Sequence, residues 1–269
     1  MTQSCGEAIA QPLHDSGVEY IFGQPGGEVV ELMEALHGKG VTFVLTGHES
    51  AAAFMAGTIG RMTGIPGACL ATLGPGACNL VLGVGSSFLD RDPLLAFSAR
   101  TAVGRSHLSN KQNLPLNDLF APITKWSVAL DGAGTGHTIQ EAIRVAVTPP
   151  RGPVYLSIPS DMTGATDRPG DSPPPPPALP EPDDRAFETI AEALNNARKP
   201  IGVIGIAMQA SKDTAAVRRF FRETGIPYVI TCQGKGIGDP LGARFLGHVL
   251  PAAGDMHITE WLEDSDCIL

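Results

Sequence analysis

Apolar residues in the first part of the chain form short continuous runs separated by periodic segments. The continuous runs, such as Val41–Leu45 and Val154–Ile158, predict buried strands, and apolar positions spaced three and four residues apart predict helices between them. Continuously apolar strands are typical of a parallel sheet covered on both faces. The predicted strands are Val18–Phe22, Val41–Leu45, Gly67–Thr72, Pro93–Phe97 and Val154–Ile158; the predicted helices are Ala8–Leu13, Pro25–Gly38, Glu49–Met62, Gly74–Leu89 and Thr138–Val147.

A proline-rich segment interrupts this alternation. Five consecutive prolines, Pro173–Pro177, favour a stiff, extended spacer. The pattern therefore predicts a doubly wound α/β domain with a parallel sheet at 1–165, a linker at 166–183, and an incomplete second Rossmann-like α/β domain at 184–269. In the second domain the predicted helices are Arg185–Ala197, Thr214–Thr224 and Ile258–Glu263, and the predicted strands are Pro200–Ile204, Pro227–Thr231 and Cys267–Leu269.

Composition narrows the class of protein. The 269 residues carry 19 Lys and Arg against 28 Asp and Glu, and a net charge of −9 disfavours nucleic-acid binding. The N-terminus lacks the layout of a signal peptide, and no apolar run approaches the ~20 residues that cross a membrane. Five scattered cysteines indicate buried thiols in a reducing cytoplasm. Charged residues make up only 17%, which indicates that a partner covers part of the surface.

The sequence lacks the motifs of several common kinds of active site. No histidine pair has the spacing of a helical zinc site, and no G-x-S-x-G elbow is present. The glycine patterns of dinucleotide-binding folds and P-loops are also missing. We therefore assign no metal ligand and no serine nucleophile to this chain.

Three turns, each following a predicted strand, carry the remaining candidate chemistry. They are Gly23–Gly27, Thr46–Glu49 and Thr72–Asn79, and the carboxyl ends of parallel strands are where open α/β sheets bind ligands. Each turn alone is weak evidence, because a Gly-Pro turn is usually only a turn and a first-turn glutamate usually faces the helix dipole. The helix after Glu49 has a face of alanine and glycine, which lets another backbone approach closely.

Taken together, these motifs resemble the pyrimidine-binding domain of thiamine diphosphate enzymes, and in particular acetolactate synthase and related 2-oxo acid decarboxylases. The resemblance implies a lyase or transferase that uses thiamine diphosphate to decarboxylate a 2-oxo acid and to join the product to a second carbonyl. It is carried by Gly17–Gly23, Pro25–Gly27, Gly47–Ala52, Gly74–Asn79, Asp92–Leu95, Pro122–Trp126 and Arg151–Asp161, and, for the family's central domain, by Ala197–Ile201, Gly225–Tyr228, Gly234–Gly236 and Ser265–Leu269.

The resemblance also implies roles for single residues. Glu49 matches the glutamate that binds N1′ of the aminopyrimidine and favours the imino tautomer, which then takes the C2 proton of the cofactor. Gln112 and His48 are expected on the substrate side, although a solvated loop side chain and a structural histidine are equally open interpretations. The implied cofactor-binding residues are Pro25, Gly26, Gly27, Glu49, Thr72, Gly74, Pro75, Gly76 and Asn79, and the implied substrate residues are His48, Arg100 and Gln112.

In this family the cofactor lies between two chains, so the resemblance implies that Glu49 acts across a dimer interface. A carboxyl group shares a proton best when it is buried. We expect the small-faced helix behind Glu49, together with a dry subunit interface, to provide that burial.

Some positions depart from the family pattern. Gly47 stands where many relatives have arginine, Ala99-Arg100 replaces Gly-Gln, and Lys111 replaces an aromatic residue, which leaves the 2-oxo acid and its acceptor open. Gly205–Met208 replaces a glycine triplet associated with flavin, which argues against bound FAD. The family's Gly-Asp-Gly…Asn segment, which holds Mg²⁺ against the diphosphate, does not occur.

Three interpretations stay open at this point. In the first interpretation, the chain is the N-terminal part of an enzyme whose Mg²⁺ and diphosphate site lies in a missing domain. The chain alone would then be marginally stable and inactive. Such an enzyme would be a homodimer or homotetramer. Alternatively, the chain is a non-catalytic or split subunit that binds a partner chain carrying that domain, or its second unit binds a nucleotide in its own right.

Overall fold

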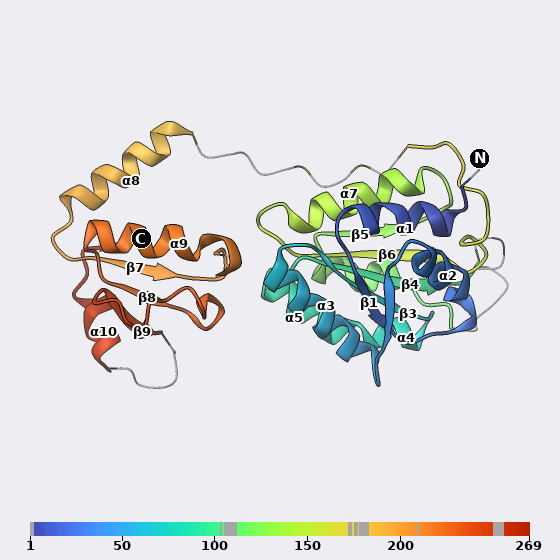
Figure 1. Cartoon of the computed structure of the whole chain (residues 1–269), viewed down its shortest axis with the longest axis horizontal. Helices are drawn as coiled ribbons and strands as arrows, with labels where there is room; N and C mark the ends of the chain where they lie inside the picture. Colours follow the sequence, from blue (N-terminus) through green and yellow to red (C-terminus); the bar gives the residue numbers. More distant parts are fainter. Residues whose placement is uncertain are drawn as a thin grey trace. The chain divides into compact units, whose positions relative to one another are not determined.

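The structure is a computed structural model, and it describes residues 3–102, 104, 112–171, 174, 177, 183–208, 210–249 and 256–269. The chain divides into two compact units, residues 1–177 and 178–269, which are drawn in Figure 1 and described separately below. Residues 166–170, expected to begin the linker, form backbone hydrogen bonds with the first unit, for example from the Arg168 N–H to the Gly132 carbonyl at 2.9 Å. Half of the predicted linker, residues 172, 173, 175, 176 and 178–182, lies outside the described residues.

The first unit is built on a six-stranded parallel sheet with strand order β2-β1-β3-β4-β6-β5. Three of its inner strands are buried except at Arg100, as their continuous apolar sequences predict. Successive residues point to opposite faces, so Leu95 and Phe97 enter one core while Leu94 and Ala96 enter the other. The strands are β1 (Tyr20–Gly23), β2 (Thr42–Leu45), β3 (Gly67–Ala71), β4 (Leu94–Arg100), β5 (Trp126–Ala129) and β6 (Pro153–Pro159).

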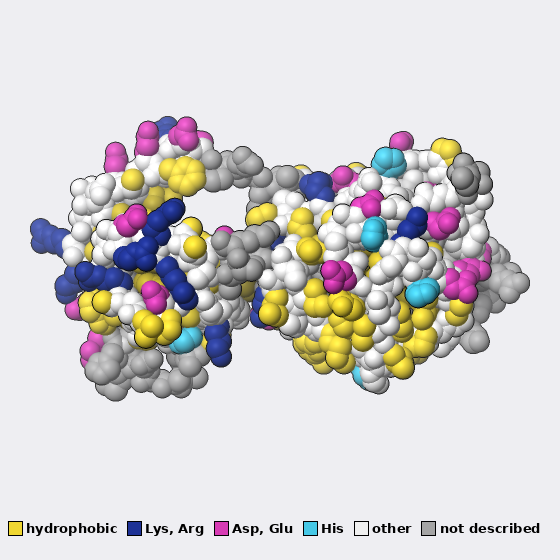
Figure 2. Space-filling model, in the orientation of Figure 1, with side chains coloured by type: hydrophobic (Ala, Val, Ile, Leu, Met, Phe, Trp, Pro, Cys, Tyr) yellow, Lys and Arg dark blue, Asp and Glu magenta, His cyan; other side chains and the backbone are white. Residues whose placement is uncertain are grey.

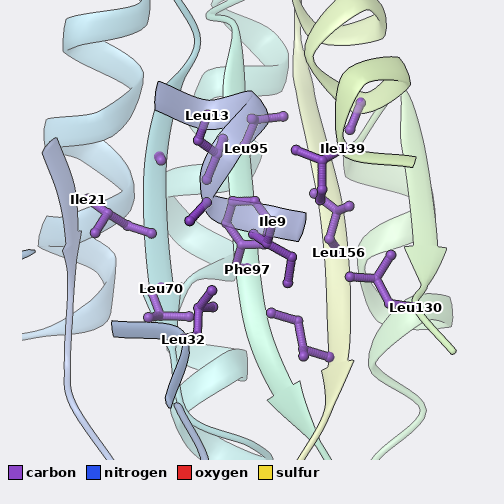
Figure 3. Packing of buried hydrophobic residues seen from close by; sticks show 14 of the residues in the cluster. Ile9, Leu13, Ile21, Leu32, Leu70, Leu95, Phe97, Leu130, Ile139 and Leu156 are labelled. Atoms are coloured by element: carbon purple, nitrogen blue, oxygen red, sulfur yellow. The ribbon is translucent and has the colours of Figure 1, made fainter. Parts of the chain in front are cut away.

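Helices cover both faces of this sheet. On one face, apolar side chains from α1, α2 and α7, including Ile9, Leu32 and Ile139, pack onto Leu70, Leu95 and Phe97 (Figure 3). On the other face, α3 and α5 pack against each other and against β3 and β4. The bounds are α1 (Cys5–Asp15), α2 (Val30–Gly38), α3 (Glu49–Thr63), α4 (Pro75–Asn79), α5 (Val81–Leu89), α6 (Leu116–Phe120) and α7 (Thr135–Val147), with short 3-10 turns at Gly27–Val29 and Ala121–Ile123.

The small-faced side of α3 is used inside its own unit. A Cβ on Gly60 would lie 2.1 Å from the Pro93 carbonyl oxygen, and one on Gly67 would lie 1.8 Å from that of Ala56. The predicted close approach is thus present, but it joins α3 to β3 and β4 of the same chain. Arg61 fixes the far end of α3 through 2.7 and 2.6 Å ion pairs with Asp92 and Asp90.

The second unit has a four-stranded parallel sheet with order β10-β7-β8-β9. Its core gathers Phe221, Tyr228 and Ile230, with the rings of Phe221 and Tyr228 stacked 4.2 Å apart. The elements are α8 (Asp184–Asn196), β7 (Pro200–Ile204), α9 (Ala210–Thr224), β8 (Tyr228–Ile230), a 3-10 turn (Cys232–Gly234), β9 (Phe245–His248), α10 (Met256–Glu263) and β10 (Cys267–Ile268).

The predicted fold class, two successive parallel α/β units, is confirmed. The strands β5 and β9 were missed, and the single predicted helix Gly74–Leu89 is two helices, α4 and α5. The prediction of five buried thiols is wrong, since only Cys5 and Cys69 are buried and Cys232 is exposed. Among the described residues, no helix has the length and apolar character needed to span a bilayer.

Candidate active site

The strand order brings the three candidate turns together. Strand β1 lies between β2 and β3, and all three run parallel, so the turns that follow them meet at one edge of the sheet. That edge is where open α/β sheets bind ligands. The juxtaposition comes from topology, because the turns are separated by whole helices in the sequence.

Glu49 is the first residue of α3 and is half-buried. Its Oε2 accepts a 2.9 Å hydrogen bond from Asn79 Nδ2, at the end of α4. The Ser50 hydroxyl donates to the Asn79 carbonyl at 2.5 Å, so the start of α3 and the end of α4 are joined twice. The carboxylate is therefore oriented by a neutral amide, while part of its surface stays open to solvent.

Two glycines let Thr72 pack closely beside this carboxylate. A Cβ on Gly76 would lie 2.4 Å from Thr72 Oγ1 and 3.2 Å from Glu49 Oε1. A Cβ on Gly26 would lie 2.3 Å from Thr72 Cγ2. Thr72 thus fills the space between the two glycines, and any side chain at either position would push into it. Gly27 has open space around it.

A short hydrogen-bond network holds the loop before Glu49. The buried Thr46 hydroxyl contacts the carbonyls of Gly23, at 3.2 Å, and His48, at 3.0 Å. The Gln24 amide donates to the Thr46 carbonyl. His48 caps α3, because its Nδ1 accepts from the Ser50 N–H at 3.1 Å. The structural interpretation of His48 is therefore supported by a contact, and its ring remains exposed.

Gln112 packs directly on the Gly74–Gly76 turn. Gly74 has φ +58°, a conformation that favours glycine, and a Cβ there would lie 2.6 Å from that of Gln112. The structure thus places Gln112 beside Gly74, Pro75 and Gly76. Lys111, the residue before it, lies outside the described residues.

Arg100 lies apart from these groups. It ends β4, and its Nη2 donates to the Leu130 carbonyl at 3.0 Å, on the side of the sheet where β6 and β5 lie. Within the described part of the chain, no contact joins Arg100 to Glu49. Burial lowers the pKa of the Arg100 guanidinium, and nearby Asp161 counteracts that shift.

The structure brings the three predicted turns together and adds supporting residues that the sequence did not indicate. Thr46, Gln24 and Ser50 received no role, although they hold the loop and the carboxylate in place. Their signal was weak, because short polar residues at strand ends commonly serve turns. No group of three histidine, cysteine or acidic side chains able to hold a metal ion occurs in the part of the chain that the structure describes.

The fold and these turns define an α/β protein whose candidate ligand-binding turns meet at the carboxyl ends of three parallel strands. Comparison with known families gives two matches: "Thiamine pyrophosphate enzyme, N-terminal TPP binding domain" at residues 3–120, and "Thiamine pyrophosphate enzyme, central domain" at residues 187–269. The chain belongs to the thiamine pyrophosphate (thiamine diphosphate) enzyme family, and the resemblance seen in the sequence is confirmed.

Individual relatives agree with this family. The chain is 31% identical over 246 residues to acetolactate synthase of Bacillus subtilis, covering 90% of this chain and 43% of that protein. It is 30% identical over 274 residues to acetolactate synthase 2, chloroplastic, of Nicotiana tabacum, covering 98% and 40%. It is 31% identical over 253 residues to a "Probable 2-ketoarginine decarboxylase" of Pseudomonas aeruginosa, covering 89% and 44%. The chain spans less than half the length of these relatives.

Proposed function

We propose that this chain forms the aminopyrimidine-binding half of a thiamine diphosphate-dependent enzyme that decarboxylates a 2-oxo acid or joins two such acids. The observation that carries the proposal is the arrangement of Glu49, Asn79 and the Gly76 turn. One carboxylate oxygen of Glu49 is bound by Asn79, and the other lies against the Gly76 turn, close to where a Cβ on Gly76 would be. The acetolactate synthase and decarboxylase relatives support the same class of substrate.

The residues present fit the aminopyrimidine ring of the cofactor. Gly26 and Gly76 both pack closely on Thr72, and Glu49 Oε1 lies against the Gly76 turn with part of the carboxylate open to solvent, so a flat ring placed on this turn would meet a carboxyl group. When bound, thiamine diphosphate supplies a carbon nucleophile and an electron sink for decarboxylation. Glu49 then holds or releases a proton at ring atom N1′, and Asn79 keeps its carboxyl group oriented. Pro25, Gly27, Thr72, Gly74 and Pro75 complete the proposed cofactor contacts.

The outer faces of α3 and α5 support the proposal that Glu49 works at an interface. Phe54, Met55, Leu82 and Leu89 are 42–77% exposed, and hydrophobic side chains gather over these two helices in Figure 2. Exposed apolar patches of this kind mark sites of protein association. Because Glu49 begins α3, a partner on this face would also cover the half-exposed carboxylate. We therefore infer that a partner chain, in a homodimer or homotetramer or as a separate subunit, docks here.

The remaining proposed roles follow from the same arrangement. His48, Arg100 and Gln112 face the substrate side. No Gly-Asp-Gly…Asn segment occurs in this sequence, so Mg²⁺ and the diphosphate would be bound by residues outside it, and this chain alone would be inactive. FAD is not part of the proposal, because Gly205–Met208 lacks the glycine triplet. The second candidate, a non-catalytic subunit that binds a partner, is favoured by the same apolar face.

A Glu49→Gln variant tests the proposal in the assembled enzyme. Glutamine keeps the size of the side chain but removes the proton that a carboxyl group shares, so CO₂ release from a 2-oxo acid such as pyruvate falls about 10²- to 10⁴-fold. Exchange of the cofactor C2 proton for deuterium, followed by NMR, should slow in parallel. Glu34→Gln, on the exposed face of α2, is the matched control and keeps the normal rate. An unchanged rate in Glu49→Gln would refute the assignment.

A further inference from the structure

A small cavity lies at the carboxyl end of β4, beside the site described above. Its volume is about 190 Å³, and it is lined by Arg100, Thr101 and the segment from Asn113 to Asp118. The cavity is several times the ~30 Å³ that one water molecule occupies in the liquid, so a small organic acid fits in it.

Two buried hydrogen-bond donors, on residues that line this cavity, lack partners in the described part of the chain. Arg100 Nε and Thr101 Oγ1 are buried, and neither finds a hydrogen-bond partner among the described residues. Leaving such a group unsatisfied is unfavourable, and more so when the group is charged. The guanidinium is nevertheless held in position, because Nη2 donates to the Leu130 carbonyl at 3.0 Å. A fixed cation with a spare donor is the arrangement expected where a ligand completes the hydrogen bonds.

The chemistry of these donors selects an anion with two oxygen atoms. A carboxylate can accept from Arg100 Nε through one oxygen and from Thr101 Oγ1 through the other. Asp161 and Asp131 act on Arg100 electrostatically, yet neither accepts a hydrogen bond from it in the described part of the chain. Burial disfavours the Arg100 cation, and an anion in the cavity would offset that unfavourable free energy.

The lining segment connects the cavity to the cofactor turn. Gln112 packs on Gly74, and the next residues, Asn113 to Asp118, line the cavity. Asn117 is fixed by hydrogen bonds with Ser127 and with Ser157, at 3.1 and 2.6 Å. A ligand in the cavity therefore lies next to the loop that touches the Gly74–Gly76 turn, while Glu49 itself makes no contact with Arg100.

The reaction class decides which carboxylate can occupy this position. In decarboxylation the C1–C2 bond of the 2-oxo acid breaks, its electron pair stays on C2, and the charged carboxylate leaves as neutral CO₂. A guanidinium bound to that carboxylate would stabilise the ground state more than the transition state and would slow the step. The Arg100 position therefore suits a carboxylate that keeps its charge.

We propose that Arg100 and Thr101 form a binding site for the substrate carboxylate that the reaction retains. This inference rests on the proposed function. The retained group is either the carboxylate of an acceptor 2-oxo acid or the distal carboxylate of a dicarboxylic 2-oxo acid. Both present the same two oxygens to the same two donors.

Ligand titration of the full chain, monitored by the Nε–H NMR signals of its arginines, tests the inference. Pyruvate and 2-oxoglutarate are the probes, and methyl pyruvate is the uncharged control. We expect both acids to shift one Nε–H signal that disappears in Arg100→Gln, and methyl pyruvate to leave it in place. Arg100→Gln and the isosteric Thr101→Val should weaken binding, the former about 10- to 100-fold. Arg185→Gln, an exposed arginine of α8, should bind as the wild type does.

The outcomes distinguish an acceptor carboxylate from a distal carboxylate. They also distinguish a failure of this inference from a failure of the proposed function. If wild type binds 2-oxoglutarate more tightly than pyruvate, and Arg100→Gln removes this difference, the site binds a distal carboxylate. If wild type binds both acids equally, and Arg100→Gln weakens both equally, the site binds the carboxylate of an acceptor. Absence of binding, or equal affinities in wild type and in both variants, would overturn the inference. Glu49→Gln should leave these titrations unchanged, so a failure of the cofactor assignment shows only in the CO₂ and C2-exchange measurements.

Discussion

Two neighbouring glycines, Gly26 and Gly27, differ in whether the surrounding residues leave room for a side chain. A Cβ on Gly26 would meet Thr72 Cγ2 at 2.3 Å, whereas nothing lies within 4 Å of one on Gly27. We expect Gly26→Ala to lower the free energy of unfolding by about 1–3 kcal/mol, because Thr72 must move, and to weaken cofactor binding. Gly27→Ala, the matched control, should change stability by no more than about 0.5 kcal/mol. Urea denaturation of both variants measures the effect on stability, and titration of Gly26→Ala with thiamine diphosphate measures its effect on cofactor binding; equal losses of stability in the two variants would contradict this account.

At the scale of residues, the sequence predicted which residues belong to the candidate site better than it predicted the contacts between them. Glu49, Asn79 and Gly76 were assigned from the resemblance, and the structure brings them together. The direction of the Arg100 side chain and the hydrogen bond from Ser50 to the Asn79 carbonyl were not predictable. Both depend on how elements distant in the sequence pack, which no local pattern records.

At the scale of elements, a lysine bound at the end of α7 is expected to make the stability of the fold depend on pH. Lys125 Nζ donates to the carbonyls of Val145 and Thr148, the latter at 2.7 Å, at the C-terminal end of α7. Burial, with a smaller contribution from Arg144, lowers the pKa of Lys125 to about 8.

The sign of the effect follows from proton binding. The unfolded chain, with a lysine pKa near ~10.4, holds this proton between about pH 8 and 10 while the folded chain releases it, so this residue makes folding more favourable as the pH rises. Urea denaturation at pH 7.5 and pH 10 should show wild type gaining stability relative to Lys125→Met. Parallel changes in the two proteins would exclude this role for Lys125.

The elements missed by the sequence analysis share a physical cause. Strands β5 and β9 lie at sheet edges, where side chains are only partly buried. Trp126–Ala129 and Phe245–His248 therefore include polar residues or glycine and form no continuous apolar run. The central strands β3, β4 and β6 are buried except at Arg100, and their apolar runs located them correctly. Edge position alone does not prevent prediction, because β2 and β10 are also partly buried edge strands and were predicted from their apolar residues.

At the scale of the whole molecule, the apolar face of α3 and α5 is expected to control assembly. Leu82 and Leu89 are 66% and 77% exposed, and burying a leucine contributes about 1.5–3 kcal/mol. The double substitution Leu82→Lys, Leu89→Lys should therefore weaken association with the partner chain by roughly 10²- to 10⁴-fold. Light scattering after size-exclusion chromatography of the assembled enzyme should show a lower mass and, because Glu49 loses its cover, a parallel loss of CO₂ release.

A control for this surface exists in the second unit. Leu241 is 97% exposed and belongs to neither apolar core of that unit, so Leu241→Lys introduces the same change in side-chain chemistry away from α3 and α5. If that variant lowers the mass as much as the double variant does, the effect comes from added charge and not from the α3–α5 face. If only the double variant loses assembly and activity together, the helix that begins with Glu49 serves both the cofactor and the interface. A single element would then couple catalysis to association.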